Sequence, residues 1–150
     1  MYSDIYMKLA IDMAQAAFND DEVPVGAIIV KDGKIVGKGS NQVIEKNSVS
    51  AHAEIIAINN ASKLLKNYRL NKCSIYVTLE PCHMCAKAIV DARIDHLYFG
   101  AMEPKTGAIK SIDQFLDRKD LNHKVNYSGG HLEKDSSKIL KNFFKLRRNK

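Results

Sequence analysis

A strand–helix–strand segment between residues 74 and 99 sets the strongest limit on the fold of this chain. Residues 74–79 and 94–99 are short β-prone runs. Pro81 suits the beginning of a helix, which should continue to about Arg93. Two strands joined by a helix in this way pair in parallel, with a right-handed crossover. The segment therefore predicts an α/β fold in which helices pack on a sheet.

The rest of the chain continues this alternation. Further helices are expected at residues 4–19, 51–67 and 133–148, and further strands at 23–30, 35–39 and 124–127, with Asp32-Gly33 as a hairpin turn. The apolar residues at helical spacing are Ile5, Leu9, Met13, Ala16 and Ala17 in the first helix, and Ile55, Ile58, Leu64 and Leu65 in the second. We predict one three-layer α-β-α domain over residues 1–150, with helices flanking a mixed five-stranded sheet.

The composition is that of an ordinary globular protein. Apolar residues make up 45% and charged residues 27% of the chain. No apolar run approaches the roughly 18 residues that a membrane helix needs, and the first residues lack the basic start of a signal peptide. Three cysteines without an export signal argue against a disulfide framework. We therefore expect a cytoplasmic protein that does not enter a membrane.

Positive charge is concentrated near the C-terminal end. The net charge is +6, and the basic residues of the last segment, which holds no acidic residue, are Lys138, Lys141, Lys145, Arg147, Arg148 and Lys150. Such a segment is typical of a surface that binds RNA or DNA. Basic residues also stabilise the C-terminal end of a helix, so charge alone leaves both interpretations open. Phe143 and Phe144 can pack on the core or stack on a base.

Cys82 and Cys85 have the C-x-x-C spacing of metal ligands, and His52 precedes them in the chain. Thiolates in the first turn of a helix are stabilised by its dipole. Two thiolates and one imidazole make three ligands for a tetrahedral zinc ion, which leaves its fourth position open for water. Zinc lowers the pKa of that water to about 7. The pattern predicts one catalytic Zn²⁺ per subunit.

Glu54 is the candidate for moving protons at this site, and we do not expect it to be a ligand. Residues two apart in the middle of a helix point to roughly opposite sides. His52 and Glu54 can therefore converge only where a helix begins, and a helix that starts near Ala51 allows this. The sequence predicts a site just beyond that helix N-terminus.

Two other interpretations of the cysteines stay open at this point. A C-x-x-C pair can be a redox pair, but that leaves His52 and Glu54 unexplained. A structural zinc site needs a fourth ligand, and Cys73 is the spare thiol. Cys73 should lie about a strand length from Cys82, so we expect it to be a small buried residue. His83 should point away from the site.

These residues resemble a known signature. His52-Ala53-Glu54 followed by Pro81-Cys82-His83-Met84-Cys85 resembles the zinc-dependent cytidine and deoxycytidylate deaminase superfamily. Longer stretches resemble the bacterial tRNA-specific adenosine deaminases, namely residues 22–27, 51–55, 67–70, 76–82, 99–101, 105–108, 122–123 and 143–148. The resemblance implies the cytidine deaminase-like fold and a homodimer. It also implies that His52, Cys82 and Cys85 bind zinc, that Glu54 is the proton shuttle, and that the substrate is adenosine at the wobble position of a tRNA anticodon stem-loop.

The resemblance also implies where the target nucleoside binds. Asn41 lies where the family contacts the nucleoside, and Ala53 lies where a backbone group meets the base. Val25 and Leu79 are expected as apolar walls of the pocket.

Contacts to the surrounding RNA are expected from five further residues. Lys105, Arg147 and Arg148 should hold phosphates, and Phe144 should contact a flanking base. Glu103 aligns with an Asp in the bacterial family member, so the charge is kept on a longer side chain. Its contacts to the nucleotide sugar should therefore differ.

Two other functions share part of this pattern. A deaminase of free guanine, free cytosine or a nucleoside has the same zinc motif, needs no basic C-terminal segment, and would be favoured by a pocket that the C-terminal helix seals. A zinc-stabilised RNA-binding module without catalysis needs a closed metal site and gives Glu54 no role.

Overall fold

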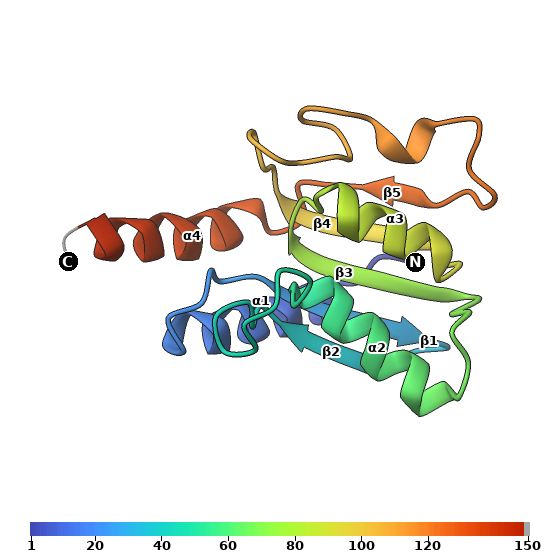
Figure 1. The fold of residues 1–150 in the computed structure, drawn as a ribbon, viewed down its shortest axis with the longest axis horizontal. Helices are drawn as coiled ribbons and strands as arrows, with labels where there is room; N and C mark the ends of the chain where they lie inside the picture. Colours follow the sequence, from blue (N-terminus) through green and yellow to red (C-terminus); the bar gives the residue numbers. More distant parts are fainter. Residues whose placement is uncertain (149–150) are drawn as a thin grey trace.

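The structure, a computed structural model, describes residues 1–148 and is built on one five-stranded sheet (Figure 1). The elements are α1 (Asp4–Asn19), β1 (Gly26–Lys31), β2 (Lys34–Ser40), α2 (Ala53–Leu65), β3 (Cys73–Leu79), α3 (His83–Asp91), β4 (His96–Ala101), the 3-10 helix η1 (Phe115–Asp117), β5 (Asn126–Ser128) and α4 (Glu133–Arg148). The strand order is β2-β1-β3-β4-β5. β1 is antiparallel to β2 and β3, whereas β3, β4 and β5 are parallel, so the predicted mixed sheet is confirmed.

Helices cover both faces of the sheet. α2 and α3 pack together on one face, and α1 and α4 contact the other (Figure 1). Alternate residues of β1 reflect this arrangement: Ala27 and Ile29 belong to the core beneath α2 and α3, and Ile28 and Val30 to the core beneath α1. The predicted three-layer α-β-α architecture is confirmed.

The β3–α3–β4 segment pairs in parallel, as its sequence predicts. Three strands begin later than expected, and one of them is β5, which starts at Asn126 rather than residue 124. β1 starts at Gly26 rather than residue 23, because a turn in which the Val25 N–H donates to the Val23 carbonyl precedes it. β4 starts at His96 rather than residue 94, because the Ile94 N–H still bonds back to the Ile89 carbonyl at the end of α3.

The buried face of α1 agrees only in part with the predicted one: Ala17 is buried and Leu9 and Met13 pack against the core, but Ala16 is exposed. Ile5 is 68% exposed, and the buried residues of the helix are Met7, Ala10, Ala14 and Ala17. The helix backbone lies very close to β1, since a Cβ on Gly26 would lie 2.0 Å from the Ala10 carbonyl oxygen. Small residues are therefore required at the contact, and a hydrophobicity pattern alone does not reveal this. Leu64, expected to face inward, is 62% exposed on α2.

α2 packs equally close to β2. A Cβ on Gly39 would lie 2.2 Å from the Ala53 carbonyl oxygen, and one on Gly37 would lie 2.5 Å from that of Ala57. Glycines on the strand and alanines on the helix allow this approach. The packing fixes the N-terminal end of α2 against the sheet.

The C-terminal ends of β2, β3 and β4 lie at the same edge of the sheet, because these strands run in the same direction. Asn41 follows β2, Glu80 follows β3, and the segment from residue 102 follows β4. α2 and α3 both begin at this edge (Figure 1). Loops and helix N-termini that are far apart in the sequence thus meet there, as is common for ligand sites in α/β proteins.

The predicted basic C-terminal helix is present as α4, which lies beside α1 and extends past the sheet (Figure 1). It carries Lys138, Lys141, Lys145, Arg147 and Arg148, while Lys150 lies outside the described residues. Among residues 1–148, no helix has both the length and the apolar character needed to cross a bilayer.

Candidate active site

His52, Cys82 and Cys85 meet where two helices begin. His52 is the N-cap of α2, Cys82 is the N-cap of α3, and Cys85 lies in the first turn of α3. His52 Nδ1 lies 3.7 Å from Cys82 Sγ and 3.4 Å from Cys85 Sγ. The three ligand atoms all lie within 4.8 Å of one another. The fold thus brings together the three residues that the sequence indicated.

This geometry fits zinc. Tetrahedral angles at ordinary zinc–sulfur and zinc–nitrogen bond lengths separate an imidazole nitrogen from each sulfur by about 3.6 Å. The observed distances of 3.7 and 3.4 Å bracket that value. Within residues 1–148, the group of potential ligands contains only these three residues. The set therefore leaves a fourth tetrahedral position for a small molecule.

Cys73 and His83 also have metal-binding side chains, but each has other contacts. Cys73 is buried in the core at the start of β3, as expected. His83 Nε2 lies 2.8 Å from Asp113 Oδ2 and is oriented toward that carboxylate. Neither residue belongs to the ligand group, which argues against a structural four-ligand site.

The close approach of these groups changes their affinities for protons. A hydrogen bond with the Cys85 thiol lowers the pKa of Cys82 to about 3, and the same bond raises the pKa of Cys85. The pKa of His52 is raised, mainly by its hydrogen bond with Cys82. A cation bound between these atoms would take the place of the shared protons, which is the usual linkage between metal and proton binding.

Glu54 lies in the first turn of α2 and is only 4% exposed. Burial raises its pKa to about 7, against the opposing effects of hydrogen bonding to its own backbone N–H and of the nearby His52. A carboxyl group with this pKa can both accept and donate a proton near neutral pH. α2 begins at Ala53, so His52 and Glu54 both lie at its N-terminal end, as their spacing requires.

A cavity of about 290 Å³ is lined by His52, Glu54 and Cys82. Four residues expected to bind the nucleoside also line it, namely Val25, Asn41, Ala53 and Leu79. Six others complete the wall and were not identified from the sequence: Glu22, Val23, Val43, Ile44, Glu80 and Thr106. We call this space the inner cavity.

A second cavity of about 740 Å³, which we call the outer cavity, adjoins the first, since Val23 and Ile44 line both. All five residues expected to contact RNA line it: Glu103, Lys105, Phe144, Arg147 and Arg148. Pro104 and Phe143 complete its lining. The outer cavity therefore combines aromatic and basic side chains beside the inner one.

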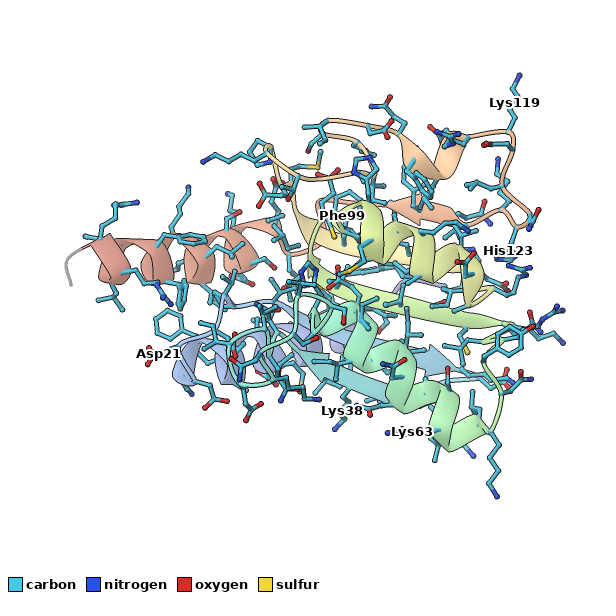
Figure 2. All side chains as sticks on the ribbon, viewed as in Figure 1. Asp21, Lys38, Lys63, Phe99, Lys119 and His123 are labelled. Carbon is cyan, nitrogen blue, oxygen red and sulfur yellow. The ribbon has the colours of Figure 1, made fainter. Side chains whose placement is uncertain are left out.

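Side chains of the outer cavity differ in their exposure and in their contacts within the protein. Phe143 is buried, whereas Phe144 is 44% exposed, so only the latter offers a ring face to a ligand. Arg147 lies over the Phe143 ring and donates from Nη1 to the carbonyl oxygen of Asp21 at 3.0 Å (Asp21 is labelled in Figure 2). The Glu103 carboxylate accepts a hydrogen bond from the Lys105 backbone N–H at 2.9 Å and is thus oriented within its own loop.

Glu22 and Glu80 are buried carboxylates that the sequence motifs did not single out. Glu22 accepts hydrogen bonds from the backbone N–H groups of Ile44 and Glu45, at 3.1 and 2.8 Å. Burial raises the pKa of Glu80, but hydrogen bonds, chiefly from Lys110 and Ser111, outweigh burial and hold that pKa below its usual value. The sequence signal that could have identified Glu22 and Glu80 is the position of each charged residue next to an apolar run.

The sequence model of the MafB19-like deaminases matches residues 1–148. The chain belongs to this family. The tRNA-specific adenosine deaminase of Aquifex aeolicus is 44% identical over 149 residues, which cover 99% of this chain and 98% of that protein. The resemblance to deaminases inferred from the motifs is therefore confirmed.

Solved structures of deaminases share the fold. One, from a study of A-to-I editing by tRNA:A34 deaminases at the wobble position of transfer RNA, is 43% identical with a TM-score of 0.89 and covers 92% of this chain and 100% of its own. The guanine deaminase of Bacillus subtilis is 31% identical with a TM-score of 0.66 and covers 100% of this chain and 96% of its own. The chain is thus similar both to a tRNA:A34 deaminase and to a guanine deaminase.

Proposed function

We propose that this protein hydrolyses adenosine to inosine and ammonia at the wobble position of a tRNA anticodon. One observation carries the proposal, namely that the inner cavity adjoins the outer cavity. The inner cavity is lined by candidate zinc ligands and by Glu54, whose pKa is about 7, and the outer cavity is lined by basic and aromatic residues. The high identity to a tRNA-specific adenosine deaminase over nearly the whole chain supports it.

In this proposal His52, Cys82 and Cys85 would hold zinc, which when bound lowers the pKa of water to about 7. Glu54 accepts a proton from the attacking water as that water adds to C6 of adenine. Glu54 then delivers the proton to the ring nitrogen and helps ammonia to leave, so the pKa of about 7 suits both directions of transfer.

The inner cavity would take the base. Its volume of about 290 Å³ is near the lower limit for ligand pockets and favours a single base over a longer segment of RNA. Val25 and Leu79 would contact the ring, and Asn41 and the Ala53 backbone would hydrogen-bond the nucleoside. Adenine in an anticodon loop is already unpaired, which keeps the cost of extruding it small.

The outer cavity would hold the neighbouring nucleotides. Lys105, Arg147 and Arg148 supply positive charge for phosphates, and the exposed ring of Phe144 offers a stacking surface. Glu103 would lie near the nucleotide sugar.

We also propose that the protein is a cytoplasmic homodimer. The support is the resemblance of the chain to bacterial tRNA adenosine deaminases, whose substrate is found in the cytoplasm. Light scattering coupled to gel filtration measures the mass in solution and would contradict the dimer by giving the monomer mass of 16.8 kDa.

Deamination of a free base is the second candidate, favoured by the similarity to a guanine deaminase. Within residues 1–148, however, the lining of the inner cavity includes no α4 residue, and α4 residues line only the outer cavity. A cavity that is not closed by α4 favours a substrate that extends beyond the base.

The decisive experiment incubates the zinc-loaded protein with an anticodon stem-loop carrying adenosine at the wobble position and measures inosine. A stem-loop with that adenosine moved to a neighbouring position is the matched control. Glu54→Ala should retain zinc and RNA binding but form no inosine. Normal turnover by that variant would contradict the role of Glu54.

Parallel assays with free guanine, cytosine, adenine and adenosine separate the alternatives. Turnover of a free base without turnover of the stem-loop would replace the proposed function with free-base deamination. Zinc and RNA binding without any turnover would indicate an RNA-binding module.

A further inference from the structure

The carboxylate of Glu80 lies at the centre of a dense set of hydrogen bonds. It is 2% exposed. Oε2 accepts from the backbone N–H groups of Ile109, Lys110 and Ser111 at 3.0, 2.7 and 2.9 Å. Oε1 accepts from the Glu103 N–H at 3.0 Å and from the Ser111 hydroxyl. Five donors on two oxygens leave Glu80 little capacity to bind substrate or carry a proton.

These donors belong to one loop, residues 102–112 after β4. The loop forms walls of both cavities, through Thr106 in the inner one and through Glu103, Pro104 and Lys105 in the outer one. Its backbone wraps closely around the carboxylate, since a Cβ on Gly107 would lie 2.4 Å from Glu80 Cδ. The hydrogen bonds of Glu80 therefore hold the backbone of the loop whose residues line both cavities.

Glu80 is also joined directly to the metal-ligand segment. It precedes Pro81 and Cys82 in the chain. The Pro81 carbonyl accepts a hydrogen bond from the Ala108 N–H of the same loop at 2.9 Å, and the Glu80 N–H donates to the Ala101 carbonyl at 2.9 Å. Glu80 and Pro81 thus bind the loop through hydrogen bonds, and the next residue in the chain, Cys82, is a candidate zinc ligand.

We propose that Glu80 is a positioning residue that fixes the 102–112 loop, and with it the substrate-contacting walls of both cavities, relative to Cys82. The requirement is for an ionised carboxylate, because every group facing its two oxygens is a donor. The effect on substrate rests on the proposed function, whereas the anchoring of the loop does not.

Glu80→Gln is the sharpest perturbation. It keeps the size of the side chain but turns one acceptor oxygen into an NH₂ group that faces N–H donors. Displacing contact groups by about 1 Å can cost roughly 100-fold in rate. We expect a loss of that order in kcat/KM for the stem-loop, carried mainly by KM because Glu80 does not touch the reacting atoms, with full zinc content. Glu133→Gln, the same change on an exposed residue of α4, is the control and should behave as wild type.

Two further variants keep the test independent of whether Glu80→Gln folds. Gly107→Ala retains the carboxylate but places a methyl group against it, so it should also raise KM. Ser111→Ala removes one donor and leaves four backbone donors, so its loss should be much smaller.

Amide hydrogen exchange supplies the readout that needs no substrate. Exchange at Ile109, Lys110 and Ser111 should be faster in Glu80→Gln than in wild type, while the N–H groups of α3 stay protected. Unchanged exchange at these three residues in Glu80→Gln would overturn the proposal. So would a loss of activity in this variant that is fully explained by a lower zinc content. If the wild type forms no inosine, the proposed function fails, and the exchange measurement still decides whether Glu80 anchors the loop.

Discussion

Removing the positive charges of the outer cavity should flatten the salt dependence of RNA binding. Lys105, Arg147 and Arg148 line that cavity. A cation that neutralises one phosphate of a single strand contributes about −0.7 to the slope of log K against log salt concentration. Three such contacts contribute about −2, so raising salt from about 50 to about 200 mM should weaken binding roughly 20-fold through them alone. The triple alanine variant should lose this share of the salt dependence.

Fluorescence anisotropy of a labelled anticodon stem-loop, titrated at several KCl concentrations, measures this slope. Every protein in the series carries Glu54→Ala, so that no RNA is converted during the titration. Lys63→Ala is the control, because Lys63 is exposed on α2, far from α4 in the view of Figure 2. Equal slopes for the triple variant and its parent would refute a phosphate-binding role for the outer cavity.

The two neighbouring arginines should differ in a second measurement. Arg147 donates to the Asp21 carbonyl and lies over Phe143, whereas Arg148 makes no such bond or ring contact within residues 1–148. Arg147→Ala should therefore also lower the free energy of unfolding, by about 1 kcal/mol, in urea denaturation. Arg148→Ala should change the salt slope and leave the urea midpoint as in wild type. The reverse order would show that the contacts of Arg147 do not stabilise the fold.

Three other outcomes concern the metal, the packing of α2 and acid stability. Cys82→Ala should purify without stoichiometric zinc by metal analysis, whereas Cys73→Ala should keep it. Gly39→Ala places Cβ 2.2 Å from the Ala53 carbonyl oxygen, so urea unfolding should show a loss of about 1–3 kcal/mol; an unchanged midpoint would contradict the close packing. Folding lowers the pKa of Glu80 from 4.5, so the ionised carboxylate stabilises the folded wild type above about pH 4.5. The stability difference between wild type and Glu80→Gln should therefore become smaller as the pH falls through the lower pKa of the folded state. A stability difference that stays constant on acidification would exclude this linkage.

The chemistry of the site was predictable because it depends on local spacing. Cys82 and Cys85 are placed by one helical turn, and the convergence of His52 with Glu54 follows once a helix is known to start between residues 51 and 53. The parallel β3–α3–β4 unit was predictable for the same reason, since its pattern of apolar residues is continuous in the chain.

The walls of the site were less predictable. Glu22 and Glu80 bind backbone N–H groups that lie 22 to 31 residues away in the sequence, and no periodic pattern reports such contacts. The buried face of α1 likewise depends on how closely its backbone approaches Gly26, which is a property of the assembled layers.

The sequence by itself determined which atoms can bind a metal and move a proton, because those residues belong to two short motifs at the beginnings of helices. Only the tertiary structure decided that the inner cavity adjoins a basic outer cavity, and that buried carboxylates hold the loops between them. The physical reason is that the meeting of separate loops depends on how the sheet edge and its helices are packed, and this information is spread over the whole chain.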